Sequence, residues 1–82
     1  MTGNEQKVRL LVHSQEQPLT LIFEFWATEY VLDPHKSVVV ELDNPDPHHP
    51  PEIGHLSDGI CFWSSGDHPS VWTLQGESIE IF

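Results

Sequence analysis

The chain has 82 residues, of which 13 are Asp or Glu and only 3 are Lys or Arg, so its formal net charge is −10 with the six histidines counted as neutral. This length supports one small domain, and the charge disfavours nucleic-acid binding, because phosphate backbones attract clustered Lys and Arg. No apolar stretch approaches the roughly 20 residues of a membrane-spanning helix. From the charge and from this absence, we expect neither nucleic acid nor a membrane as a partner.

The ends and the cysteine content favour a cytoplasmic location. The first residues lack the apolar run of a signal peptide, and one cysteine cannot form an internal disulfide. We expect a single β domain over residues 1–82, in which residues 1–6 are flexible.

Apolar residues recur at every second position along most of the chain, which is the period of strands with one buried face. The predicted strands are, in chain order, residues 7–13, 18–26, 29–32, 37–42, 52–57, 59–64, 70–75 and 78–82. Residues 44–51 contain four prolines, which lack the amide donor that a strand needs, and this segment is predicted to be a loop. The predicted fold class is all-β, a single antiparallel sandwich or barrel of seven or eight short strands.

The first two predicted strands are expected to form a hairpin with residues 14–17 as its loop. Opposed residues in a hairpin have a constant index sum, and this loop places the apolar residues of both strands on one face. On the other face, Lys7 would lie opposite Glu24. Such a hairpin needs a second layer, which the C-terminal strands would supply.

The last four predicted strands are expected to form a meander. Asp58-Gly59 is a strong hairpin signal, because this dipeptide adopts the positive φ of a type I′ turn, and it would pair Leu56 with Cys61. Further turns at residues 65–69 and at Gly76-Glu77 place one apolar set on the core face: Ile60, Phe62, Trp72, Leu74, Ile79 and Ile81. The opposite face would carry Trp63, Leu56 and Val71.

These three residues, Trp63, Leu56 and Val71, are the candidate partner-binding residues. Tryptophan is common in interaction hot spots, and an uncovered apolar patch is typical of a binding site. Burial within the fold, or against a second copy of the chain, is the alternative interpretation. The favoured function is a non-catalytic interaction module that binds a protein partner or forms a homodimer.

Histidine-rich loops give the alternative function, a metal or small-ligand site. Alternating strand directions would bring residues 43–51 and 65–69 to one end of the sheet. The candidate ligands are His48, His49, His68, Asp46 and Asp67. Imidazole and carboxylate suit zinc or another divalent transition metal, although neither HExxH nor CxxC is present. Outside this alternative, no cofactor is expected.

No catalytic residues are predicted, and we expect that the protein is not an enzyme. Cys61 lies in the middle of a strand, where a free cysteine usually behaves as a small hydrophobe, and no base can be assigned to it. The acidic residues could dock on a basic partner or simply maintain solubility. Their scattered distribution favours solubility.

Three short motifs follow one another in the first half of the chain: Pro18-Leu-Thr-Leu-Ile-Phe-Glu-Phe-Trp26, Glu29-Tyr-Val-Leu-Asp-Pro34 and Val38-Val-Val-Glu41. With these motifs the chain resembles a group of small uncharacterised bacterial proteins, in which P-L-x-L-x-x-E-x-W precedes E-Y-x-L-x-P and a Val-rich strand. The resemblance implies an all-β fold and carries no function. The Y-x-L-x-P turn is also similar to half of a cupin-like jelly roll, but the H-x-H motif of the cupin metal site is absent.

Overall fold

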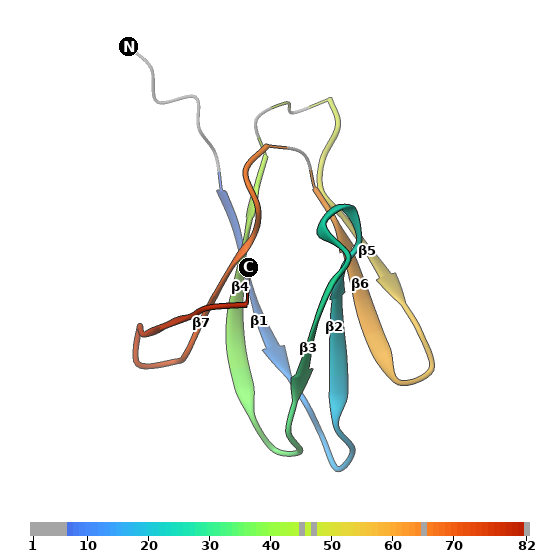
Figure 1. Cartoon of the computed structure of the whole chain (residues 1–82), viewed down its shortest axis with the longest axis vertical. Coiled ribbons are helices and arrows are strands. Elements are labelled where there is room, and N and C mark those ends of the chain that lie inside the picture. The colour runs from blue at the N-terminus through green and yellow to red at the C-terminus, as the bar shows by residue number, and fades with distance from the viewer. Residues whose placement is uncertain (1–6, 45, 47, 65, 82) are drawn as a thin grey trace.

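The computed structural model describes residues 7–44, 46, 48–64 and 66–81, and in these residues the chain forms eight strands in two four-stranded sheets (Figure 1). The strands are β1 (Lys7–His13), β2 (Leu19–Phe23), β3 (Thr28–Leu32), β4 (Ser37–Asp43), β5 (Glu52–His55), β6 (Gly59–Trp63), β7 (Ser70–Trp72) and β8 (Ser78–Ile79). A 3₁₀ turn, η1 (Glu24–Trp26), follows β2. The all-β prediction is confirmed, and the flexible segment predicted for residues 1–6 lies outside the described residues.

The two sheets stack as a sandwich, the first of the two predicted architectures. The sheet that we call the β1 sheet has the order β1-β4-β7-β8, and the β2 sheet has the order β3-β2-β6-β5. Figure 1 shows β7, β4 and β1 on one side and β2, β6 and β5 on the other. Every described pair of neighbouring strands is antiparallel except β2 and β6, which run parallel.

The core lies between the sheets and is built from alternate residues of the central strands and of β1 and β3. Its buried members are Val12, Val38, Val40, Leu42 and Val71 from the β1 sheet, and Leu21, Phe23, Leu32 and Phe62 from the β2 sheet. The rings of Phe23 and Phe62 stack with their centroids 5.2 Å apart, across the parallel pairing of β2 with β6. Burial of side chains of this size stabilises the fold by about 1.5–3 kcal/mol each.

The predicted hairpin of the first two strands is wrong. β1 pairs with β4, and residues 14–17 cross from one sheet to the other. Lys7 therefore lies opposite Asp43, with Nζ 2.5 Å from the carboxylate, and does not face Glu24. The apolar face of β1 suits either partner, but β4 offers seven paired residues, which satisfies more backbone hydrogen bonds than the shorter β2.

Ser14 holds this crossing segment against the link between β3 and β4. Its buried hydroxyl donates to the carbonyl oxygen of Asp33 and accepts a hydrogen bond from the N–H of Lys36 at 3.0 Å. The N–H of Ser14 also donates to the carbonyl oxygen of Lys36, at 2.9 Å. These bonds fix the point at which the chain leaves the β1 sheet.

The hairpin predicted at Asp58-Gly59 forms, but its register is shifted by two positions. The N–H of Leu56 donates to the carbonyl oxygen of Gly59 at 2.9 Å, so the turn residues are Ser57 and Asp58. Cys61 lies opposite Gly54 and not opposite Leu56. Gly59 serves the close approach of two strands, because a Cβ there would lie 2.6 Å from the carbonyl oxygen of Thr20 in β2.

The predicted meander is wrong at its centre, since β6 and β7 belong to different sheets. The last hairpin does form, but Thr73 and Glu77 enclose three residues, with Gly76 at φ +91°. Val71 consequently faces Ile79, where the prediction had Leu74. This odd shift turns Val71 into the core and leaves Leu74 59% exposed.

Candidate functional site

The outer face of the β2 sheet presents apolar side chains from β3, β2 and β6, and from Leu56 directly after β5. Strand alternation directs Val31, Ile22 and Trp63 outward, and Leu56 continues the outward positions of β5. Val31 is 54% exposed and Leu56 is 42% exposed, while Ile22 and Trp63 are half-buried. We call this set of four residues the Trp63 face.

Trp63 lies flat over a glycine on the neighbouring strand. A Cβ added to Gly54 would meet the indole carbons Cζ3 and Cη2 at 2.8 and 2.9 Å. The ring therefore occupies the space that a side chain at position 54 would take, and it reaches from β6 over the neighbouring strand β5. The missing side chain of Gly54 gives the indole ring room to lie over β5, on the same outward face as Leu56.

Cys61 lies beneath this surface and is buried at 4% exposure. Burial raises the pKa of its thiol, and a hydrogen bond to Glu24 and the negative charge of that carboxylate raise the pKa further. The thiol is therefore protonated at neutral pH, which removes the thiolate that a nucleophile needs. Cys61 is therefore a packing residue and not a nucleophile.

Among the described residues, the charged side chains around the Trp63 face are acidic. Glu29 and Glu52 point outward from the two edge strands, Glu24 contacts Cys61, and Asp58 lies in the β5–β6 turn. The three basic residues of the chain are elsewhere: Lys7 and Arg9 on β1, and Lys36 in the β3–β4 link. The fold thus gathers acids that are scattered in the sequence around one apolar surface.

Two of the three predicted partner-binding residues, Trp63 and Leu56, share this face. Val71 does not, because it is 1% exposed in the core of the other sheet. Sequence reasoning missed Val31 and Ile22. Their outward parity was visible in the alternation of their strands, but their place on the same sheet face as Trp63 depends on the parallel pairing of β2 with β6.

The histidine-rich loops do share one end of the sandwich, as predicted. The N–H of Asp67 donates to Asp43 Oδ2 at 2.7 Å, which joins the β6–β7 loop to the end of β4. Of the predicted ligands, only His49 and Asp46 contact each other through their side chains, whereas His68 turns to its own loop. His49 Nδ1 lies 2.7 Å from Asp46 Oδ2, and His68 Nδ1 lies 3.0 Å from the carbonyl oxygen of Pro69.

The remaining predicted ligand, His48, contributes its backbone N–H to Asp46 Oδ1 at 2.9 Å. Among the described residues, no group of three or more His, Cys, Asp or Glu side chains is arranged to hold a metal ion. The contacts of Asp46 are those of a loop that is closed by its own side chains.

Asp43 connects the end of β4 to both β1 and the β6–β7 loop, and replacing it tests the loop assembly. The hydrogen bond from Lys7 lowers the pKa of Asp43, burial opposes this effect, and the N–H of Asp67 adds to the lowering. We expect Asp43→Asn to lower the free energy of unfolding by about 1–2 kcal/mol at about pH 7, because the charged acceptor is lost.

The pH dependence of this difference has a defined sign. A pKa that is lower in the folded state than in the unfolded state stabilises the fold above the unfolded value of about 3.9, and this contribution is lost as the pH falls through the folded pKa. Urea unfolding at several pH values should show the Asp43→Asn deficit shrinking in acid. Asp58→Asn, in an exposed turn, is the control with an expected change within about 0.5 kcal/mol. If the stability difference between the wild type and Asp43→Asn stayed constant as the pH fell below the folded pKa of Asp43, the stabilising role of the Asp43 carboxylate would be contradicted.

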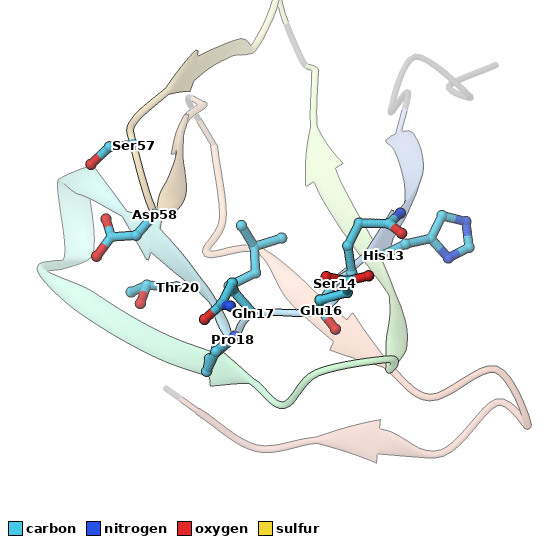
Figure 2. A pocket seen from close by; sticks show the side chains of 10 residues that line it. His13, Ser14, Glu16, Gln17, Pro18, Thr20, Ser57 and Asp58 are labelled. Atoms are coloured by element: carbon cyan, nitrogen blue, oxygen red, sulfur yellow. The ribbon is translucent and has the colours of Figure 1, made fainter.

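A groove of about 730 Å³ runs along the crossing segment between the sheets, lined by residues 13–20 and by Ser57 and Asp58 (Figure 2). Figure 2 shows Ser57 and Asp58 on one side and His13 and Ser14 on the other. The buried hydroxyl of Ser14 is already committed to backbone partners. The groove is open, and its lining mixes polar and apolar surface, which is unlike the enclosed apolar concavity of a typical small-molecule site.

In the part of the chain that the structure describes, no helix has the length and apolar character needed to cross a membrane. Comparison of the chain with known protein families, with curated proteins and with solved structures finds no match.

Proposed function

We propose that this chain is a non-catalytic interaction module whose Trp63 face binds a segment of a partner protein that is both apolar and basic. The observation that carries the proposal is the combination on one sheet face of four apolar side chains with a wholly acidic surround. The buried free thiol of Cys61 is compatible with a reducing compartment, and we propose a cytoplasmic location.

The apolar part of the face supplies the affinity in this proposal. Contiguous exposed apolar surface on a small domain is typical of protein interaction sites, and Trp is enriched among residues that dominate binding energy. Trp63 is half-buried and packs over Gly54, and a tryptophan side chain has only two rotatable bonds, so little side-chain entropy is lost when a partner covers it. Val31 and Leu56 extend the contact to the two edge strands.

The charged part of the face selects the partner. A second copy of the chain, with its formal net charge of −10, would place acids against Glu24, Glu29 and Glu52. Like charges across an interface are unfavourable, whereas Lys or Arg side chains beside an apolar anchor complement the acids and accelerate association. The partner segment is therefore expected to alternate or mix apolar and basic residues.

A random peptide library displayed on phage is the direct test. Peptides selected on the immobilised protein should be enriched in Lys or Arg together with aromatic or aliphatic residues. Their affinity should fall as salt increases, because exposed charge pairs are screened. Chemical shift changes in the protein should map to Val31, Ile22 and Trp63.

Substitutions on the face give the quantitative prediction. Trp63→Ala should weaken binding of a selected peptide by about 2 kcal/mol, or roughly 30-fold, because it removes the central anchor. Leu56→Ala should weaken it by about 1 kcal/mol. Leu74→Ala, the same change at an exposed leucine in the β7–β8 turn, should leave the affinity unchanged in titration calorimetry.

Three results would contradict the proposal. The first is selection of acidic or uncharged peptides, and the second is a set of shifts confined to the β1 sheet. The third is equal sensitivity of binding to Leu56→Ala and Leu74→Ala. Circular dichroism and thermal unfolding of Trp63→Ala separate loss of binding from loss of the fold.

A further inference from the structure

The four edge strands of the sandwich are not equally protected. β8 has two residues, β5 has four and follows Pro50 and Pro51, and β3 has five and lies between η1 and Pro34. β1 has seven residues without proline and pairs with β4 in unbroken register. Long regular edges expose unpaired backbone groups that pair readily with another strand, and natural proteins usually shorten or interrupt them.

The backbone groups on the open side of β1 can be assigned. The N–H of Ser14 points toward β4, where it donates to the carbonyl oxygen of Lys36. Because these groups alternate along a strand, the N–H and C=O of Arg9, Leu11 and His13 point away from β4. In the described part of the chain, β1 ends its sheet and has no strand partner on that side.

The outer face beside this edge is apolar at its centre. Leu11 lies opposite Val39, and Val39 lies opposite Trp72, so the three form one row across β1, β4 and β7. Leu11, at the open end of this row, is 56% exposed. We call these three residues the Leu11 row.

The charges beside the row cancel in pairs. Lys7 Nζ lies 2.5 Å from Asp43, and Arg9 Nε lies 3.3 Å from Glu41. A chain with a formal net charge of −10 repels its own copies most strongly through unpaired acids. At the β1 edge both basic residues of the strand meet acids of β4, so a second copy encounters the least repulsion there. Because these charges are balanced, a second copy of the chain is the partner that best fits the β1 edge.

We infer that two copies of the chain associate by antiparallel pairing of their β1 strands about Leu11. Leu11 of one protomer then lies opposite Leu11 of its partner, and Arg9 lies opposite His13 of its partner, so that each of these pairs exchanges two backbone hydrogen bonds. The two β1 sheets become one continuous sheet, and the Leu11 row continues into the same row of the partner. The interface is two-fold symmetric and closed, which gives a dimer rather than a filament.

This dimer leaves the Trp63 face uncovered, because that face belongs to the other sheet. The inference rests on the β1 edge and its charges, and it stands independently of the proposed partner. A dimer would present two Trp63 faces, which increases the apparent affinity for a partner with two binding segments.

Sedimentation velocity of the full chain over a wide concentration range tests the inference. We expect a concentration-dependent monomer–dimer equilibrium. Leu11→Lys should raise the dissociation constant at least tenfold, because it places two lysines directly opposite each other across the dyad. Leu74→Lys, the same substitution at a residue of similar exposure away from the edge, should leave the constant unchanged.

Amide hydrogen exchange measured by NMR at low and high concentration supplies the residue-level readout. The amides of Arg9, Leu11 and His13 should gain protection at high concentration, whereas the amides of the β3 edge strand should not. This measurement needs no substitution and is unaffected by any loss of folding in a variant.

Each remaining outcome overturns the inference. A wild-type chain that stays monomeric at all concentrations shows that β1 does not pair with itself. A dimer that survives Leu11→Lys but is lost in Trp63→Ala places self-association on the Trp63 face. Concentration-dependent protection at β3 or β5 in place of β1 assigns it to another edge.

Discussion

Replacing Phe62 by alanine is expected to lower the free energy of unfolding by about 3–5 kcal/mol. The ring is 1% exposed and stacks on Phe23, so its removal leaves a cavity between the two sheets as well as losing burial. A domain of this size is typically stable by only about 4–12 kcal/mol, so this single change removes a large part of the total.

Urea unfolding followed by tryptophan fluorescence measures this effect. Leu74→Ala is the matched control, since it removes an exposed side chain and should change the stability by less than about 0.5 kcal/mol. The loss of stability caused by Phe62→Leu should lie between the losses caused by Phe62→Ala and Leu74→Ala, because leucine fills part of the cavity. A loss below about 1 kcal/mol for Phe62→Ala would mean that the ring does not bridge the sheets.

Gly59→Ala is the second substitution with a large expected effect, about 3 kcal/mol or failure to fold. The added Cβ would lie 2.6 Å from the carbonyl oxygen of Thr20, which is a backbone atom of the adjacent parallel strand. Relief requires β2 and β6 to separate, and this breaks the pairing that brings Phe23 against Phe62.

Gly54→Ala provides the contrast. Its Cβ would also make a contact below 3 Å, but with the outer carbons of the Trp63 ring, which can rotate toward solvent. We expect a loss below about 1 kcal/mol, together with a change in Trp63 fluorescence. Equal losses for the two glycines in urea unfolding would contradict the distinction between a fixed backbone contact and a movable side chain.

Part of the candidate site was predictable because strand alternation is insensitive to even shifts in register. The β5–β6 hairpin is displaced by two positions from its predicted register, yet Leu56 and Trp63 remain on the outward face. The β7–β8 hairpin is displaced by three positions, and this odd shift moves Val71 from the predicted surface into the core. One turn residue thus decides whether a predicted binding residue is exposed.

The amino-acid composition shows that the chain is acidic, but the sequence does not show that acidic side chains gather around the Trp63 face. Glu24, Glu29 and Glu52 are separated along the sequence, and their distribution favoured a role in solubility. The β2 sheet brings them around one apolar surface through the pairing of β2 with β3 and β6. The same pairing leaves the basic residues Lys7 and Arg9 on the other sheet.

The all-β class, the position of most strands and the buried face of β1 follow from the sequence alone. These depend on a two-residue period and on proline, which act locally whatever the partner strand is. Which strands pair depends on contacts between distant parts of the chain. The β1–β4 ladder and the parallel β2–β6 pair join segments with no tight turn between them, so no local signal reports their register. Their pairing is selected by the burial of both apolar faces at once, which is a property of the whole chain.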